Sequence, residues 1–162
     1  MREISELLWA KPMERPAGIP IGRPRGAKAA GLRYERALVR ALPPPKVHGQ
    51  WFEFEDRRGR GVCQPDILVS RERGGMIAVL EAKYSWTAEG HQQLEKLYLP
   101  VVQMALGRSA VGILVTRRLV SEMLKGIVIC STLEQAVWFA REGRRVVWHW
   151  LGTVEMARAK AA

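Results

Sequence analysis

The segment from Gln64 to Tyr84, QPDILVSRERGGMIAVLEAKY, constrains the fold more than any other part of the chain. It contains two apolar runs, PDILVS and MIAVLEAK, separated by RERGG, whose two glycines suit a hairpin turn. Charged residues stand only near the ends of these runs: Asp66 in the first, and Glu81 and Lys83 in the second. The pattern predicts an antiparallel pair of largely buried strands with charged side chains at one end.

These charged side chains are expected on one face of the sheet. Side chains alternate along a strand, so Glu81 and Lys83 point the same way, about 7 Å apart at the backbone. The hairpin brings the first strand alongside and can place Asp66 next to Glu81. Two adjacent carboxylates raise each other's pKa unless a cation lies between them. The sequence therefore predicts a site for a divalent metal ion at this end of the hairpin.

A third carboxylate is expected from a helix. GLRYERALVRAL, from Gly31 to Leu42, predicts a helix that ends before the prolines at positions 43–45. Glu35 shares a face of this helix with Leu38 and Leu42, so it lies on the stripe that faces the sheet. Taken alone, such a glutamate is most simply an edge residue paired with an arginine. Beside the two other carboxylates, we expect it in the same site.

The rest of the chain predicts a single-domain α/β fold. Further strands are expected over residues 46–56, 111–116, 126–130 and 144–152, and further helices over residues 90–106 and 131–142. Ser131 and Glu134 have the spacing of a capping box at the start of the last helix. The order of elements is αβββαβ with a C-terminal β-α-β extension. A mixed central sheet flanked by helices is the natural packing for this order.

Composition favours a polyanionic partner. Lysine and arginine number 26 against 16 aspartates and glutamates, which gives a formal charge of +10. Nucleic acid is the first partner to expect and an anionic membrane surface the second. No apolar run is long enough to span a membrane, and the first 30 residues lack the apolar core of a secretion signal, so we expect a soluble cytoplasmic protein. Cys63 and Cys130 lack the spacing of a disulfide framework or a zinc site.

Residues 1–30 are expected to form a flexible basic arm ahead of a domain over residues 31–155. Residues 11–28 contain four prolines, three glycines and five basic residues. Proline removes backbone donors and glycine adds chain entropy, so we expect no packed element there. Two interpretations of the arm remain: a disordered leader, or a segment that contacts a partner.

Three fragments of the chain together resemble the PD-(D/E)xK nuclease superfamily. They are Glu35 on the first helix, Pro65-Asp66 on the first hairpin strand, and Glu81-Ala82-Lys83 on the second. Each fragment is common by chance, so the resemblance rests on their order, their strand context and the short hairpin between them. It covers residues 31 to about 116. It implies a restriction-endonuclease-like αβββαβ core, which is the order of elements predicted above.

Within that superfamily, GLRYERALVRAL resembles the opening helix of the archaeal-type Holliday junction resolvases, with Gly31, Glu35 and Arg36 at the matching positions. Two departures leave the substrate open. The resolvases usually have a serine directly after Glu-x-Lys, whereas this chain has Tyr84 before Ser85. The segment HQQLEKLYLPVVQMALG is also similar to the glutamine-rich helix of many other phage and repair nucleases.

The resemblance implies a metal-dependent DNA endonuclease, most like a homodimeric enzyme that cuts four-way junctions by paired incisions. Asp66, Glu81 and the backbone carbonyl of Ala82 would hold Mg²⁺, and Mn²⁺ could replace it. Glu35 would bind a second ion or act through a water, and Lys83 would orient the attacking water and stabilise charge on the phosphate. Two alternatives remain: another DNA nuclease of this superfamily, or a DNA-binding module on the same fold that does not cut.

DNA contacts are expected from the arm, the first helix, the arginine-rich turn and the segment after the catalytic strand. The residues are Arg23, Arg25, Lys28, Arg36, Arg57, Arg58, Arg60, Ser85 and His91. The apolar stretch over residues 127–151 could supply a dimer interface, although a core role is expected for most of its members.

Overall fold

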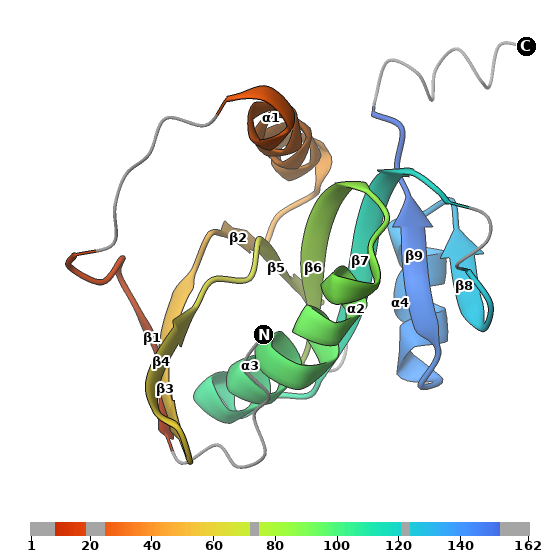
Figure 1. Cartoon of the computed structure of the whole chain (residues 1–162). Coiled ribbons are helices and arrows are strands. Elements are labelled where there is room, and N and C mark those ends of the chain that lie inside the picture. Colours follow the sequence, from red (N-terminus) through yellow and green to blue (C-terminus); the bar gives the residue numbers. More distant parts are fainter. Residues whose placement is uncertain (1–8, 19–24, 72–74, 121–123, 153–162) are drawn as a thin grey trace, which may run out of the picture.

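The computed structural model describes residues 9–18, 25–71, 75–120 and 124–152. Its main sheet has six strands, which are β2 (Lys46–His48), β5 (Ile67–Arg71), β6 (Met76–Ser85), β7 (Ala110–Arg118), β8 (Ile127–Cys130) and β9 (Arg145–His149). Their order across the sheet is β2-β5-β6-β7-β9-β8 (Figure 1). The first three pair antiparallel, and β6, β7, β9 and β8 pair parallel. The mixed sheet that the sequence predicts is confirmed.

Helices cover both faces of the main sheet. On one face lie α1 (Gly26–Ala41) and α4 (Leu133–Arg141). On the other lies a continuous segment made of α2 (Ala88–Gln93), the π-helical turn η1 (Leu94–Tyr98) and α3 (Leu99–Leu106). None of the helices in the described ranges is long and apolar enough to cross a membrane.

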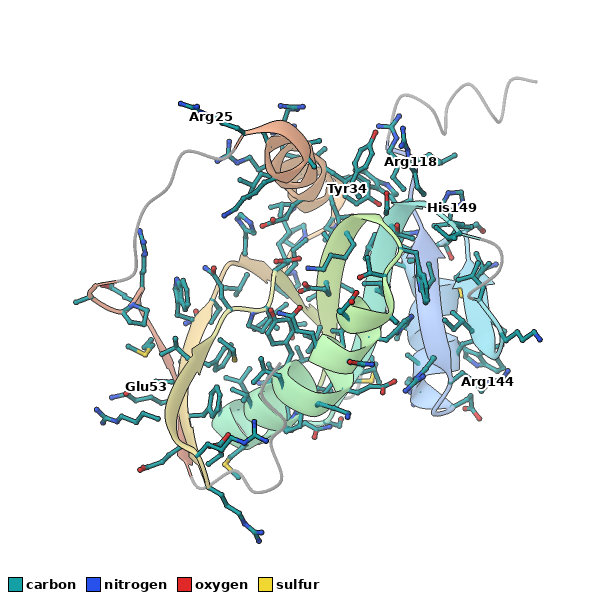
Figure 2. All side chains as sticks on the ribbon, in the orientation of Figure 1. Arg25, Tyr34, Glu53, Arg118, Arg144 and His149 are labelled. Carbon is teal, nitrogen blue, oxygen red and sulfur yellow. The ribbon has the colours of Figure 1, made fainter. Side chains whose placement is uncertain are left out.

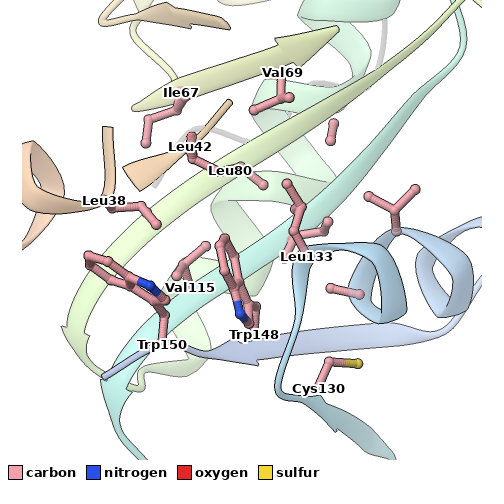
Figure 3. Close-up of a cluster of buried hydrophobic side chains, with 14 of the residues drawn as sticks. Leu38, Leu42, Ile67, Val69, Leu80, Val115, Cys130, Leu133, Trp148 and Trp150 are labelled. Carbon is pink, nitrogen blue, oxygen red and sulfur yellow. The ribbon is translucent and has the colours of Figure 1, made fainter. Parts of the chain in front are cut away.

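The two cores follow from the alternation of side chains along the strands. Leu80 of β6 belongs to the core under α1 and α4, whereas its neighbour Val79 belongs to the core under the α2–α3 segment. Figure 3 shows the first core, where Leu38 and Leu42 of α1 approach Leu80 and Val115. β6 is thus buried on both faces from Ile77 to Glu81, as a central strand should be.

A second, antiparallel sheet packs beside the α2–α3 segment, and the sequence does not predict it. It consists of β1 (Trp9–Met13), β3 (Trp51–Asp56) and β4 (Gly59–Cys63) in the order β1-β3-β4 (Figure 1). Phe52 and Phe54 of β3 are buried in the same core as α3. The small sheet therefore enlarges the second core instead of extending the main sheet.

Two expectations for this region are wrong. The strand expected over residues 46–56 divides at Gly49, whose φ of +65° suits glycine, so β2 joins the main sheet and β3 the small one. The expectation that residues 11–28 form no packed element fails for residues 11–13, which lie in β1, and for residues 26–28, which lie in α1. Pro12 fits because β1 is an edge strand, where a missing amide donor is tolerated.

Helix boundaries also differ from the sequence pattern. α1 begins at Gly26 instead of Gly31, because the alanines and the lysine between them are strong helix formers. The N-cap of α4 is Thr132, whose hydroxyl accepts a hydrogen bond from the amide of Gln135. The capping box expected from Ser131 and Glu134 is therefore wrong by one residue.

Candidate active site

The ends of β5 and β6 bring together the carboxylates expected from the hairpin. Ile67 pairs with Leu80, so Asp66, one residue earlier, stands opposite Glu81. Oδ2 of Asp66 accepts a 2.7 Å hydrogen bond from the backbone amide of Ala82, which holds the aspartate against β6. The predicted adjacency of Asp66 and Glu81 is present in the structure.

Glu81 combines deep burial with incomplete hydrogen bonding. It is 1% exposed, and its Oε1 lies 2.5 Å from Nζ of Lys83, two residues further along the same face of β6. No donor among the described residues reaches its Oε2. Because a buried carboxylate oxygen without a donor is costly, the site favours a further positive charge at this point.

The acidic cluster, which we define as Asp66, Glu81 and Glu35, carries more negative charge than its surroundings offset. Burial and the carboxylates of Glu81 and Glu35 raise the pKa of Asp66 to about 8, against the opposing effects of the Ala82 amide and the Lys83 ammonium group. Burial also raises the pKa of Glu81, although its ion pair with Lys83 opposes this. One lysine therefore leaves the cluster short of positive charge.

Lys83 is held as a cation in this environment. Burial alone would lower the pKa of its ammonium group, but the charges of Glu81, Asp66 and Glu35 raise it above the ordinary value. An ammonium group can donate hydrogen bonds to a phosphate oxygen or to a water. It cannot accept a proton, so Lys83 is unsuited to act as a general base.

Glu35 approaches Asp66 and Glu81 from α1, as the helix pattern predicts. It is half-buried, and its charge raises the pKa of both Asp66 and Glu81. Its hydrogen-bond partner is His48 at the end of β2, whose Nε2 lies 2.6 Å from Oε1, and not the arginine that a simple edge residue would have. The sequence gives no local signal for His48, which reaches the site only because β2 pairs with β5.

Tyr98 and Gln93 form a second contact that the sequence pattern does not reveal. Nε2 of Gln93 donates a hydrogen bond to the hydroxyl of Tyr98, which is buried. Burial, followed by the charges of Glu81 and Asp66, raises the pKa of Tyr98, so the phenol lies near the acidic cluster. The two residues are five apart along the chain, and the π-helical turn η1 aligns residues at that spacing.

The donor set fits Mg²⁺ better than a metal that needs a complete cage of side chains. Asp66 and Glu81 offer two adjacent carboxylates, Glu81 has an oxygen without a donor, and the carbonyl of Ala82 follows directly. In the part of the chain that the structure describes, no group of three His, Cys, Asp or Glu side chains is placed to hold a metal ion, so a metal here would depend on two carboxylates, the carbonyl and water. Mg²⁺ is commonly bound through one or two carboxylates and keeps several waters, whereas structural zinc requires four protein ligands.

Most of the residues expected to contact DNA lie on the surface. The exposed ones are Arg25, Lys28 and Arg36 at α1, and Arg57, Arg58 and Arg60 at the β3–β4 hairpin. Arg60 is also 3.2 Å from Glu53 on the neighbouring strand. Ser85 is half-buried at the end of β6, and Arg23 lies outside the described residues.

His91 does not agree with the expectation of a DNA contact. It is 6% exposed, and its ring centroid lies 6.4 Å from that of Trp86. Burial lowers the pKa of the imidazole, which favours the neutral form. A neutral, buried ring offers little to a phosphate, so His91 is a core residue.

Comparisons with protein-family models, with curated proteins and with solved structures found no match for this chain. The chemistry of the acidic cluster and the charge of the surface around it are therefore the basis for a functional assignment.

Proposed function

We propose that the protein is a metal-dependent DNA endonuclease with a restriction-endonuclease-like core of the PD-(D/E)xK type. The observation that carries this proposal is the pairing of half-buried Asp66 with buried Glu81 at the end of an antiparallel hairpin, with Lys83 bonded to Glu81. A structural ion pair would explain why Glu81 and Lys83 lie together. It would not explain why Asp66 is held beside them at the cost of a raised pKa. Phosphodiester hydrolysis needs such a site, because an anionic nucleophile must reach an anionic phosphate.

The residues around the carboxylate pair have separate tasks in this proposal. Mg²⁺, held by the carboxylates of Asp66 and Glu81 and by the Ala82 carbonyl, would neutralise charge and make water more acidic at neutral pH. Lys83, as a cation, donates hydrogen bonds to the phosphate and orients the attacking water. Glu35 accepts a hydrogen bond from that water, and His48 fixes the glutamate through their 2.6 Å contact.

The exposed side of α1 supports a contact with DNA phosphates. Five basic side chains lie on this helix and its N-cap, namely Arg25, Lys28, Arg33, Arg36 and Arg40. Together with the formal charge of +10, they favour contacts with the DNA backbone that do not depend on base sequence. A DNA strand that runs along α1 would bring one of its phosphates towards the acidic cluster, because Glu35 lies on the same helix.

The substrate in this proposal is branched DNA, most simply a four-way junction cut by a homodimer. One site cuts one strand, whereas resolving a junction needs two incisions related by a two-fold axis. β8 is an edge strand of the main sheet, and exposed apolar side chains lie there and on α4: Ile129 is 46% exposed and Trp138 is 58% exposed. Valines 137, 146 and 147 and Trp148 are buried in the cores, so the proposed dimer surface is the β8 edge of the sheet, with Ile129 on the face away from α4 and Trp138 on α4 itself.

Incubation with supercoiled plasmid, linear duplex and a synthetic four-way junction, each in Mg²⁺ or EDTA, tests the proposal. We expect cleavage of the junction that is lost in EDTA and in Asp66→Asn. Equal cleavage of all three substrates would retain the nuclease and remove the junction preference. DNA binding without cleavage in Mg²⁺ or Mn²⁺ would favour a non-cutting module. In that case the Glu81–Lys83 and Glu35–His48 pairs would be structural contacts.

A further inference from the structure

A pocket of about 330 Å³ lies between α1 and the ends of β6, β7 and β9. We call it the aromatic pocket, because its lining includes Tyr34, Tyr84 and Trp150, together with Arg33 and Arg117. Among the residues that the structure describes, no acidic residue lines it. Its volume is at the small end of the range for ligand sites, which suits one flat ring better than a larger molecule. Aromatic walls and arginines together select a planar group that carries negative charge.

The rings of the aromatic pocket are held in place by their mutual contacts. The hydroxyl of Tyr34 donates a 2.9 Å hydrogen bond to the carbonyl of Trp150, and the Tyr34 ring lies 6.1 Å from that of Tyr84 at a nearly perpendicular angle. The guanidinium carbons of Arg117 and Arg118 lie 5.8 and 5.2 Å from the centroid of Tyr84. Figure 2 shows Tyr34 and Arg118 at the same end of the molecule. A site ordered in this way loses little entropy when it binds a ligand.

Two pairs of consecutive residues connect the aromatic pocket to the acidic cluster. On α1, Tyr34 lines the pocket and Glu35 belongs to the cluster. On β6, Tyr84 lines the pocket, while Lys83 points to the opposite face and bonds to Glu81. Glu81 and Tyr84 are about 10 Å apart along the strand. A nucleic-acid strand that crosses the end of β6 can therefore reach both places at once.

We propose that the aromatic pocket holds an unstacked nucleobase of the DNA strand that is cut, with the adjoining phosphate on Arg33 and Arg117. A base inside a duplex has both faces covered, so only an unpaired or extruded nucleotide can enter. Tyr34 and Trp150 are 6% and 4% exposed, so the base would stack on the half-buried ring of Tyr84. Such stacking tolerates any base, so the pocket reads the single-stranded state and not the sequence. This inference rests on the proposed nuclease function and specifies its substrate as DNA with an unpaired nucleotide close to the scissile phosphate.

Fluorescence anisotropy with a labelled oligo(dT) strand and a matched duplex, both in EDTA so that nothing is cut, tests the proposal. Tyr84→Ala should weaken binding of the single strand about tenfold through loss of one base–aromatic stack, and binding of the duplex much less. Tyr84→Phe, which keeps the ring, should bind like the parent. Thermal unfolding of both variants checks that the core beside Tyr84 is intact.

An arginine variant gives a second readout that does not depend on the packing of Tyr84. Arg117→Ala should weaken binding of the single strand more than the control Arg144→Ala. Arg144 carries the same charge but directly precedes β9, at the end of that strand away from the pocket (Figure 2). Equal effects of these two substitutions would overturn the proposal, as would equal losses for single strand and duplex in Tyr84→Ala. Free dAMP that competes as well as the oligonucleotide would overturn the assignment to a DNA strand.

Cleavage assays on the same proteins separate the two proposals. Cutting of DNA without any Tyr84-dependent binding of the single strand would retain the nuclease and remove the role of the aromatic pocket. Tyr84-dependent binding of the single strand without cutting in Mg²⁺ or Mn²⁺ would support the pocket and remove the nuclease.

Discussion

Oε1 of Glu81 lies 2.5 Å from the ammonium nitrogen of Lys83, two residues further along the same strand. The other carboxylate oxygen of Glu81 has no donor among the described residues. Burial, together with the carboxylates of Glu81 and Glu35, raises the pKa of Asp66 to about 8. A divalent cation that contacts both carboxylates would satisfy the two together.

Substitutions at the carboxylate pair and at the lysine should separate cutting from binding. Asp66→Asn, Glu81→Gln and Lys83→Ala should each lower the cleavage rate by about a hundredfold to a thousandfold or more, because each acts on the ion or on the water. DNA affinity should change little, because it comes from the distributed basic surface. Glu89→Gln, at an exposed glutamate of α2, is the control and should cut at the parental rate. Any of the three variants that cuts like the parent would remove its residue from the site.

Without metal ions, the contribution of Asp66 to stability should fall as the pH rises. Its folded pKa of about 8 lies above the ordinary value of 3.8, so the folded state keeps a proton that the unfolded state loses over this range. The contribution is complete below pH 3.8 and is lost as the pH rises through about 8. Asp66→Asn should therefore melt several degrees above the parent at pH 9 in EDTA, and the difference should be smaller at pH 5. A difference in Tm that does not vary with pH would contradict the raised pKa.

Mg²⁺ should raise the Tm of the parent protein, and more at pH 8 than at pH 5. An ion that binds only the folded state adds about 2.7 kcal/mol of stability at a hundred times its Kd. Protons compete with the ion for the same carboxylates, so the gain should shrink at lower pH. Glu81→Gln should remove most of the gain. Calorimetric titration that detects no Mg²⁺ or Mn²⁺ binding at pH 8 would refute the proposed metal site.

Substitutions at the Glu35–His48 pair should have milder effects than those at Asp66 or Glu81. Glu35→Gln should lower the cleavage rate by more than its loss of stability explains, because the glutamate acts on the water and lies at the edge of the cluster. His48→Ala should lower the rate in the same direction, and His48→Gln, which keeps a side-chain donor, should restore part of it. Rates and melting temperatures measured together decide this. A rate that falls only in proportion to unfolding would reduce the pair to a structural contact.

The proposed dimer surface on β8 and α4 should be sensitive to charge. Ile129→Glu and Trp138→Glu should convert the dimer to a monomer in sedimentation velocity at micromolar concentration, since each places a charge in an apolar contact. Met104→Glu, at an exposed methionine of α3, is the matched control and should leave the dimer intact. A parent protein that is monomeric both free and on a four-way junction would exclude paired incision by a dimer and leave a strand-nicking enzyme.

The hairpin and its carboxylates were predictable because the information is local. The side-chain period of two places Glu81 and Lys83 on one face, and the glycines between the strands indicate where the chain turns. Antiparallel register then brings Asp66 to Glu81. Glu35 was predictable for a similar reason, because the helical period alone places it beside Leu38.

Other parts depend on partners that are distant in sequence or on irregular geometry. Residues 9–13 contain a proline, and nothing local indicates that they pair with β3. His48 enters the site only through the pairing of β2 with β5. Tyr98 reaches Gln93 through a π-helical turn, which a search for the regular helical period of 3.6 residues does not detect.

The pairing of β1 with β3 has a consequence for the order of folding. Trp9 pairs with Glu55, whereas the hairpin of β5 and β6 closes locally, with Arg71 opposite Met76. During synthesis β1 leaves the ribosome well before its partner and must wait until α1, β2 and β3 have followed. An edge strand that docks last is also the first to detach, so its amides should exchange with solvent sooner than those of β6. β1 can then detach on its own while β3 stays in the second core and β5 and β6, whose ends hold Asp66 and Glu81, stay paired.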